Sequence, residues 1–533
     1  CRAPEPHAHP HVSSRARRRR FFANVEKDLA LVEANAGGEA LVFEVLGESR
    51  RALEAFRADV EAAPQLRKLL ARELGGVVGQ ESVRFDPFTL VSHATDATDW
   101  RLHLPLAVTF PTEEAQVAPL LAAIARLGLK AIPRGAGTGL TGGAVPLHPR
   151  CVVVNSERLD RIRGVSERAI EVDGVARPAK VLEVEAGVVT ERAMEHATER
   201  GLVFATDPTS AWACTIGGNI AENAGGKDCV LWGTCIDNLL SWRMAMPSGK
   251  TWTVRRTDHR LRKILPQDPV TFEVDDGSGA PPRRIALTGA EIRKKGLWKD
   301  ITNKALGGVP GLQKEGTDGV ITSAEFILHP QYEAQRTLCL EFFGPDFDEA
   351  SEVILDLARA FPFPNEGHEA LSALEHFDDE YVRAIDYQVK AARAETPRAV
   401  LLIDVVGHAE AEVERGIARI RAILEPHPST ELFVARDAAE GKRFWHDRKR
   451  LGAIARRTNA FKMNEDIVLP LEALAEFARW VEATNVDEER HAQARFLDRA
   501  EAVLSEAAVG DGGKGQAADK APAALERLGR ARE

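Results

Sequence analysis

The chain has 533 residues, of which 44% are hydrophobic and 28% are charged, and its net charge is -10. These values exclude a wholly disordered chain and a collagen, and the negative charge argues against a dedicated nucleic-acid-binding protein. At about 150 residues per domain, the length predicts two to four domains. Six cysteines without C-x-x-C spacing indicate neither a disulfide framework nor a cysteine metal site. We therefore expect a cytoplasmic protein, with peripheral attachment to the inner face of a membrane as an alternative.

The first segment, residues 1–80, is predicted to be an N-terminal extension. Residues 1–20 combine histidines, prolines and the run Arg17 to Arg20, a composition typical of a solvated, disordered leader. Residues 49–75 have apolar side chains near helical spacing and predict a helix. No apolar run reaches the roughly 18 residues of a membrane helix, so no transmembrane segment is expected. Because the chain begins with Cys1, we expect that it does not start at its natural first residue.

From residue 81 onward, short apolar strands alternate with amphipathic helices, which predicts an α/β or α+β fold; we adopt α+β as the fold class. Residues 81–332 form a first domain, within which 252–310 resemble an insertion with its own turns. A second strand and helix pattern covers 333–485. Residues 486–533 are charged, rich in alanine and glycine, and predicted to be a flexible tail.

The most informative motif is the loop "PRGAGTGLTGGAVP", residues 133–146. Five glycines without side chains allow tight turns and let several backbone N–H groups point inward, which makes a cradle for phosphate oxygens. Gly137, Gly139 and Gly142 match the G-x-G-x-x-G pattern of a Rossmann fold. That pattern requires a helix to begin inside the motif, whereas Pro146 and a strand follow here. A strand–loop–strand cradle is the better prediction, and no Gly-Lys-Ser/Thr sequence supports a Walker loop.

Two further segments are rich in small residues. "DPTSAWACTIGGNIAENAGG", residues 207–226, would let the backbone approach a flat ring or a diphosphate. "KEGTDGVITSAEF", residues 314–326, is a glycine-containing turn that leads into a strand.

Together, these three segments resemble the PCMH-type FAD-binding domain of the vanillyl-alcohol oxidase family, in particular the branch of D-lactate dehydrogenase, glycolate oxidase and D-2-hydroxyglutarate dehydrogenase. "RGAGTGLTGGAVP" is similar to the pyrophosphate loop of that branch, "CTIGGNIAENAGG" to its second loop and "EGTDGVIT" to its third. The resemblance implies a two-subdomain FAD-binding domain over 81–332, followed by a partial ferredoxin-like α/β cap domain over 333–485.

The resemblance also implies which residues contact FAD. The diphosphate would be wrapped by the first loop, and the flavin and ribityl chain by the other two. The implied residues are Arg134, Gly135, Ala136, Gly137, Thr138, Gly139, Leu140, Gly142, Gly143, Pro208, Thr215, Gly218, Asn219, Asn223, Gly226, Gly319 and Ile321. Thr138 stands where covalent members have a linking His, so non-covalent FAD is implied. Glu222 replaces a usual Thr, and a carboxylate beside a diphosphate would be unfavourable unless it points outward.

In the cap, residues 444–474 resemble the family segment that binds the carboxylate of a 2-hydroxy acid, and Arg448 and Lys462 fall on its two cationic positions. An Arg offers a two-pronged donor to a carboxylate and a Lys adds a point charge. The family's later histidine-containing and "EHG" segments, which bind a metal or accept the hydroxyl proton, have no counterpart here, and no metal site is predicted. Either the chain is a fragment, which we favour, or another base acts, with Glu465 and Asp466 as candidates.

The resemblance thus implies an FAD-dependent oxidoreductase that removes a hydride from a small D-2-hydroxy acid. Its electron acceptor would be a quinone, a cytochrome or an iron–sulfur protein, and no nucleic acid takes part. The alternatives are an oxidase that uses oxygen and an FAD-binding subunit without turnover of its own.

Overall fold

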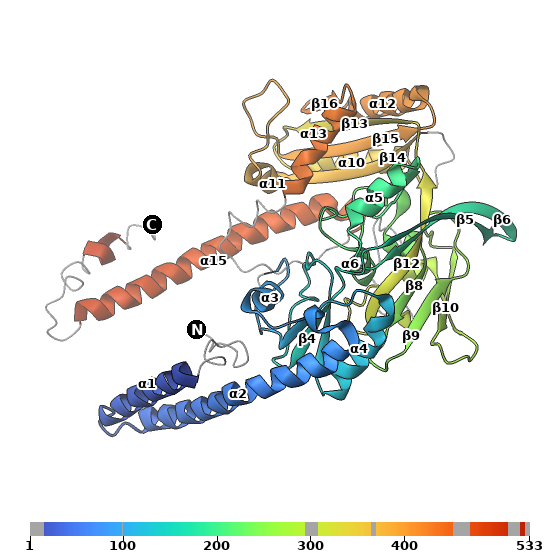
Figure 1. Cartoon of the computed structure of the whole chain (residues 1–533). Helices are drawn as coiled ribbons and strands as arrows, with labels where there is room; N and C mark the ends of the chain where they lie inside the picture. The colour runs from blue at the N-terminus through green and yellow to red at the C-terminus, as the bar shows by residue number, and fades with distance from the viewer. Residues whose placement is uncertain are drawn as a thin grey trace.

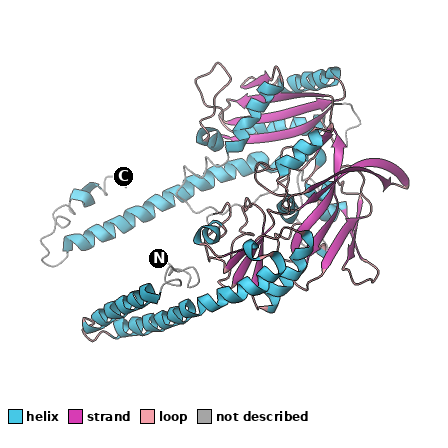
Figure 2. Ribbon diagram, viewed as in Figure 1, coloured by secondary structure: helices cyan, strands magenta, loops and turns pink. Residues whose placement is uncertain are grey.

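The computed structural model describes residues 15–98, 100–293, 308–363, 369–450, 469–509 and 523–527. Its described part contains three sheets with helices packed on them, which confirms the predicted α+β fold (Figure 2). Two sheets belong to the first domain and the third to the cap, which lies above them in Figure 1. The chain passes between the two domains after residue 330.

The first sheet has the strand order β1-β2-β4-β3, in which β3 and β2 both run parallel to β4. Its strands are β1 (Val83–Arg84), β2 (Ala107–Thr109), β3 (Lys130–Arg134) and β4 (Cys151–Asn155). Helices α2 (Ala40–Val78) and α4 (Glu114–Arg126) cover one face with Leu70, Leu74 and Leu120, and α3 (Pro87–Ser92) lies against the other with Leu90. The apolar run of β4 is buried throughout because it is a central parallel strand.

The second sheet has eight strands in the order β11-β10-β9-β8-β12-β6-β5, with β7 paired to β12. Its bounds are β5 (Ile162–Val172), β6 (Val175–Glu185), β7 (Leu202–Val203), β8 (Leu239–Ala245), β9 (Thr251–Arg256), β10 (Pro269–Asp275), β11 (Arg283–Thr288) and β12 (Val320–Pro330). The described residues of 252–310, which were predicted to be an insertion, extend this sheet, because β9, β10 and β11 continue the antiparallel pairing that β8 begins. Periodicity alone could not show which strand they pair with.

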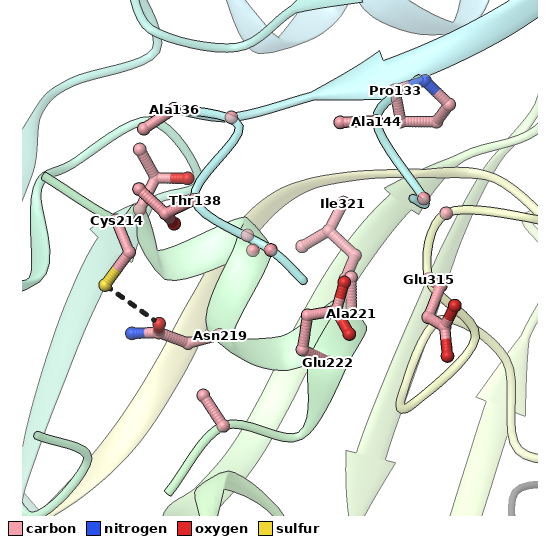
Figure 3. Close-up of a pocket in the computed structure, with 18 of the residues that line it drawn as sticks. Pro133, Ala136, Thr138, Ala144, Cys214, Asn219, Ala221, Glu222, Glu315 and Ile321 are labelled. Atoms are coloured by element: carbon pink, nitrogen blue, oxygen red, sulfur yellow. Dashed lines mark hydrogen bonds between the residues drawn. The ribbon is translucent and has the colours of Figure 1, made fainter. Parts of the chain in front are cut away.

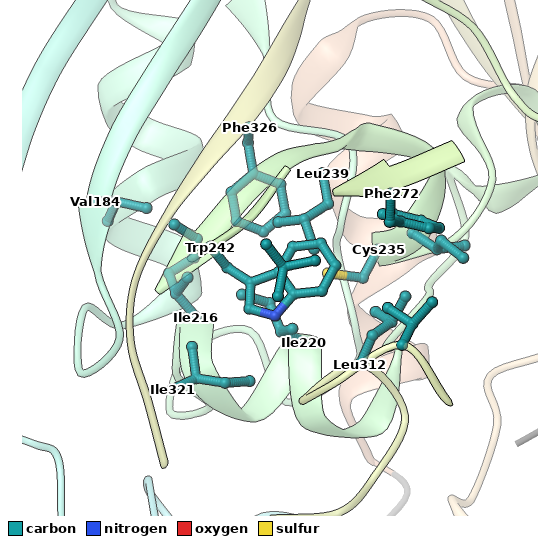
Figure 4. Packing of buried hydrophobic residues seen from close by; sticks show 14 of the residues in the cluster. Val184, Ile216, Ile220, Cys235, Leu239, Trp242, Phe272, Leu312, Ile321 and Phe326 are labelled. Atoms are coloured by element: carbon teal, nitrogen blue, oxygen red, sulfur yellow. The ribbon is translucent and has the colours of Figure 1, made fainter. Parts of the chain in front are cut away.

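The largest core lies against this second sheet (Figure 4). Trp242 of β8 is fully buried, its ring contacts Phe272 of β10 at a centroid distance of 5.8 Å, and its indole N–H donates to the Pro310 carbonyl at 3.1 Å. Four short helices also belong to this domain, namely α5 (Thr190–Thr198), α6 (Ile216–Glu222), α7 (Cys229–Trp232) and α8 (Cys235–Asn238). Ile216 and Ile220 anchor α6 in the core, which fixes the segment that carries the second glycine motif. A further short helix, α9 (Gly289–Ile292), follows β11.

The cap confirms the predicted ferredoxin-like pattern, with a four-stranded antiparallel sheet in the order β14-β15-β13-β16. The chain order is β13 (Ala334–Phe342), α10 (Asp348–Ala360), β14 (Glu369–Asp378), α11 (Asp379–Ala384), β15 (Ala399–Gly407), α12 (Glu410–Leu424), β16 (Thr430–Val434) and α13 (Ala438–His446). Helices α10 and α12 pack on one face of this sheet, against strand residues such as Leu338 of β13 and Ile403 of β15. The opposite face carries a smaller apolar cluster that includes Val400 and Leu402. It also carries the polar residues Thr337, Glu375 and Asp404, which together we call the polar cap face.

Both ends of the chain are more helical than predicted. Helix α1 (Arg15–Ala34) includes the Arg17 to Arg20 run, because Phe22 packs on Phe56 and Val60 of α2. Helix α15 (Leu474–Val509) extends through the first half of the predicted flexible tail, since alanine and the charged residues there also have high helix propensity. In Figure 1 both α15 and the α1–α2 hairpin project away from the sheets. None of the described helices is both long and apolar enough to cross a membrane.

Candidate FAD site

A cavity of about 770 Å³ lies between the two sheets of the first domain, at the ends of β3, α6 and β12. All three segments singled out in the sequence line it (Figure 3). The predicted residues that line it are Arg134, Gly135, Ala136, Gly137, Thr138, Gly139, Leu140, Gly143, Pro208, Thr215, Gly218, Asn219, Asn223, Gly319 and Ile321. Gly142 and Gly226 do not line it. Gly142 turns the loop in the left-handed region at φ 84°, and Gly226 packs tightly on Asp207.

The first loop connects two parallel strands, which confirms the predicted strand–loop–strand arrangement. Within the described part of the chain, no hydrogen bond takes up the N–H groups of residues 136–141. Unclaimed N–H groups beside a cavity are the donors that a diphosphate requires. A side chain at position 139 would enter space bordered only by the flexible carboxylate of Glu222, at 3.2 Å from its Oε1. The loop therefore fits an FAD diphosphate.

Arg134 supports this loop with its side chain as well as with its backbone. Its guanidinium donates to the Thr95 carbonyl at 2.6 Å and to the Ser92 carbonyl at 3.4 Å. It fills the place that a side chain at Gly137 would take, and Gly137 has a φ of 70°. Burial lowers the pKa of Arg134, but an arginine remains charged. The loop is thus wrapped around a half-buried positive charge, which favours an anion on its inner side.

The second segment is positioned by its asparagines, whose side chains hold the loop together. The Asn219 amide donates to the Thr190 hydroxyl at 2.8 Å, and its oxygen accepts from the Cys214 thiol at 3.4 Å. Asn223 ends α6 in the left-handed conformation, and its side-chain oxygen accepts from the Ile236 N–H at 2.9 Å. Both residues line the cavity, as predicted, but these contacts show that their side chains also determine the shape of the wall.

In the third segment, the cavity wall begins before Gly319, the first of its residues that was predicted to contact FAD. Gln313 and Glu315 line the cavity with positive φ angles of 54° and 53°. Their N–H groups donate to the carbonyls of Ile220 and Ala221, at 3.1 and 2.9 Å, so this turn is fixed on the end of α6. A glycine pattern cannot reveal such residues, because a left-handed conformation is uncommon for any other residue type.

Glu222 does not point outward. Its Oε1 accepts from the Thr141 hydroxyl at 3.4 Å and lies over Gly139, so the carboxylate reaches across the first loop (Figure 3). The sequence showed that Glu222 was unusual but could not give its direction. A negative charge therefore borders the proposed diphosphate cradle.

Arg448 lies just after α13, where the cap meets the second segment. Its Nε is 2.5 Å from Glu375 Oε2 on the polar cap face, and its Nη1 donates to the Asp207 carbonyl at 3.4 Å, next to the cavity residue Pro208. Burial would lower the pKa of Arg448, but Glu375 and Asp207 outweigh it and raise the pKa. The pairing with Glu375 was not predicted, since no sequence pattern joins positions 73 residues apart. Lys462, Glu465 and Asp466 lie outside the described residues.

Comparisons with known proteins agree with this geometry. The family profile described as "FAD binding domain" matches residues 105–255, and the profile "FAD linked oxidases, C-terminal domain" matches 345–497. The glycolate oxidase subunit GlcD of Escherichia coli K12 is 28% identical over 345 residues, which cover 65% of this chain and 57% of that protein. A D-lactate dehydrogenase of Anaerostipes hadrus is 22% identical over 72% of this chain and 69% of its own.

Among solved structures, alkyldihydroxyacetonephosphate synthase superposes with a TM-score of 0.51 at 17% identity, over 72% of this chain and 65% of that protein. This likeness concerns the fold. The chain spans little more than half the length of the Escherichia coli glycolate oxidase subunit. The two matched domains, their order along the chain and the cavity at the glycine loops show that the chain belongs to the FAD-linked oxidases with a PCMH-type FAD-binding domain.

Proposed function

We propose that this chain oxidises a small D-2-hydroxy acid, of the D-lactate, glycolate or D-2-hydroxyglutarate type, to the corresponding 2-oxo acid. The observation that carries the proposal is the position of Arg448, a cation of the cap whose side chain is 12% exposed and which reaches the wall of the FAD cavity beside Pro208. FAD supplies the two-electron redox chemistry when it is bound. The relatives whose names mention glycolate, D-lactate and D-2-hydroxyglutarate support this substrate class.

This proposal gives the chain's own residues the following roles. The N–H groups of residues 136–141 would hold the diphosphate, with the charge of Arg134 behind them. Arg448 would hold the substrate carboxylate, with Lys462 as the proposed second cation. The hydroxyl proton of the substrate needs an acceptor, for which Glu465 and Asp466 remain the candidates. The electron acceptor is proposed to be a quinone, a cytochrome or an iron–sulfur protein.

We further propose that FAD is bound without a covalent link, because Thr138 lines the cavity where covalent relatives carry a histidine. Acid precipitation of the flavin-loaded protein should release FAD into the supernatant. Flavin that stays with the precipitate would contradict this proposal.

The decisive experiment is anaerobic addition of D-lactate, glycolate or D-2-hydroxyglutarate to the FAD-loaded chain, followed at the flavin absorbance band. Bleaching by one D-acid and not by its L-enantiomer is the expected result; for glycolate, which has no enantiomers, acetate serves as the control. FAD that binds but is bleached by none of them would favour the second candidate, an FAD-binding subunit without turnover.

A further inference from the structure

The turn that follows α6 contacts the cap directly. Gly225 lines the cavity, and two residues later the Lys227 ammonium lies between carboxylates of both domains. Its Nζ donates to Asp228 Oδ1 at 2.7 Å and to Asp404 Oδ2 of strand β15 at 3.3 Å. The Asp404 side chain is only 1% exposed. A lysine of the cofactor domain is therefore inserted into a buried carboxylate site of the cap.

The cap forms this carboxylate site with its own residues. Asp404 Oδ1 accepts from the Thr337 hydroxyl at 2.6 Å and from the Trp445 indole N–H at 2.9 Å, which leaves Oδ2 directed at Lys227. The Lys227 ammonium also lies 5.1 Å from the centroid of the Trp445 ring, within the range of a cation–π interaction. Thus the oriented carboxylate of Asp404 and the aromatic face of Trp445 together form a binding site for one ammonium group.

A second contact joins the same two elements. Arg448, three residues after Trp445, donates to the Asp207 carbonyl at 3.4 Å. Asp207 belongs to the turn that holds Lys227, because its Oδ1 accepts from the Asp228 N–H at 3.2 Å and its backbone is pressed against Gly226. The cap therefore contacts this turn of the cofactor domain at two points. At the first, Lys227 meets Asp404 and Trp445; at the second, Arg448 meets Asp207.

The charges make the first contact sensitive to the loss of either partner. Burial would lower the pKa of Lys227, but Asp228 and the neighbouring carboxylates outweigh it and raise the pKa. Removing one member of a buried pair leaves the other charge uncompensated, which costs far more than the pair itself contributes. Without the ammonium, Asp228 and Asp404 would face each other across the domain boundary.

We propose that Lys227 is a positioning residue that seats the cap on the cofactor domain and so determines where Arg448 stands over the FAD cavity. The seating itself is independent of the reaction. Only its consequence for substrate rests on the proposed function, in which Arg448 holds the carboxylate.

The seating is tested by hydrogen exchange on the full chain loaded with FAD. Lys227→Met should accelerate exchange in β15 of the cap, and Asp404→Asn should accelerate it at residues 225–228 of the other domain, each by at least about 5-fold. Arg262→Met is the matched control, because it breaks an ion pair with the buried Asp268 inside one domain, at 2.7 Å. It should leave both segments unchanged. Unchanged exchange in Lys227→Met and Asp404→Asn would overturn the proposal.

The consequence for substrate is tested with oxalate, whose binding is followed by flavin absorbance. Lys227→Met should weaken oxalate binding by about 10-fold without a comparable change in FAD affinity, and Lys227→Arg should retain most of the binding. Oxalate affinity equal to the parent's in Lys227→Met would overturn the link to Arg448. If the parent itself binds no oxalate while the exchange results are as expected, the proposed function fails and the seating role of Lys227 stands.

Discussion

The FAD cavity and the polar cap face are built in different ways. The cavity wall is mostly backbone and small residues from three short segments, such as the loop around Gly137 and Gly139. The carboxylates of the polar cap face are paired with cations that are distant in sequence, as in the Asp404–Lys227 pair, 177 residues apart. A cavity wall of this kind is determined locally, because glycine is required wherever the backbone must turn or approach a ligand. The cap contacts exist only once the two domains have met.

The largest expected effect comes from a substitution in the cavity, which should change FAD binding without altering the cap. Gly139→Val should abolish FAD binding, with a rise in Kd of at least about 100-fold, because the side chain would occupy the space beside the unclaimed N–H groups. Thermal stability of the apo protein should change little, since only the flexible Glu222 borders that space. Gly76→Val is the control, at an exposed glycine of α2 with nothing within 4 Å. Equilibrium binding by flavin fluorescence measures both, and full FAD occupancy in Gly139→Val would show that the diphosphate lies elsewhere.

The second prediction concerns the cap. Substitutions of Arg448 and of its partner Glu375 should change oxalate affinity in opposite directions. Arg448→Met should weaken oxalate binding by about 10–100-fold, the value of a hydrogen bond to a charged group. Glu375→Gln should strengthen it, because the substrate carboxylate no longer competes with Glu375 for the guanidinium. Arg383→Met changes an exposed cation of the same domain and should have no effect. Titration of the flavin spectrum provides the measurement. Equal oxalate affinity in all three variants would make Arg448 a purely structural cation.

The difference between the two regions explains what the sequence could predict. Gly137, Gly139 and Gly319 line the cavity, as the glycine motifs predicted. At Gly137 and Gly319 a side chain would also collide with Arg134 and Met244. Gly226 was predicted to contact the cofactor, but it does not line the cavity; a side chain there would meet the Asp207 carbonyl at 2.0 Å. The ferredoxin-like cap was implied by the family resemblance, and the alternation of strands and helices after residue 333 agreed with it. The partners of Arg448 and Lys227, and the continuation of the second sheet by β9 to β11, depend on pairings that no local pattern encodes.

The third prediction uses pH to probe the turn that joins the two regions. Burial and the nearby Asp228 raise the pKa of Asp207 to about 8, from 3.8 in an exposed aspartate. Between about pH 4 and pH 8, the folded state therefore keeps a proton that the unfolded state releases. The stability contributed by this group is present at low pH and decreases as pH rises, by at most about 1.4 kcal/mol per pH unit.

Asp207→Asn should flatten this part of the pH profile of thermal unfolding. Asp86→Asn is a control of opposite sign, because the backbone N–H of Thr89 lowers the pKa of the Asp86 carboxyl. The stability that Asp86 contributes is present above its usual pKa and is lost in acid. A parent and an Asp207→Asn variant with parallel profiles from pH 4 to pH 8 would show that Asp207 is ionised in the folded protein.

The smallest expected effect tests whether the cavity tolerates a charge of the wrong sign. Glu222→Gln should strengthen FAD binding by about 5-fold, because two like charges about 4 Å apart in water repel by about 1 kcal/mol. The gain should shrink at high salt, which screens this repulsion. Glu199→Gln removes a carboxylate that is 72% exposed and remote from the cavity, and should leave FAD affinity unchanged. If Glu222→Gln instead weakens FAD binding at every salt concentration, the carboxylate accepts a hydroxyl of the cofactor. The cradle would then combine an anion-binding half around residues 136–138 with a sugar-binding half at Gly139, and the diphosphate would lie closer to Arg134 than the glycine spacing alone suggests.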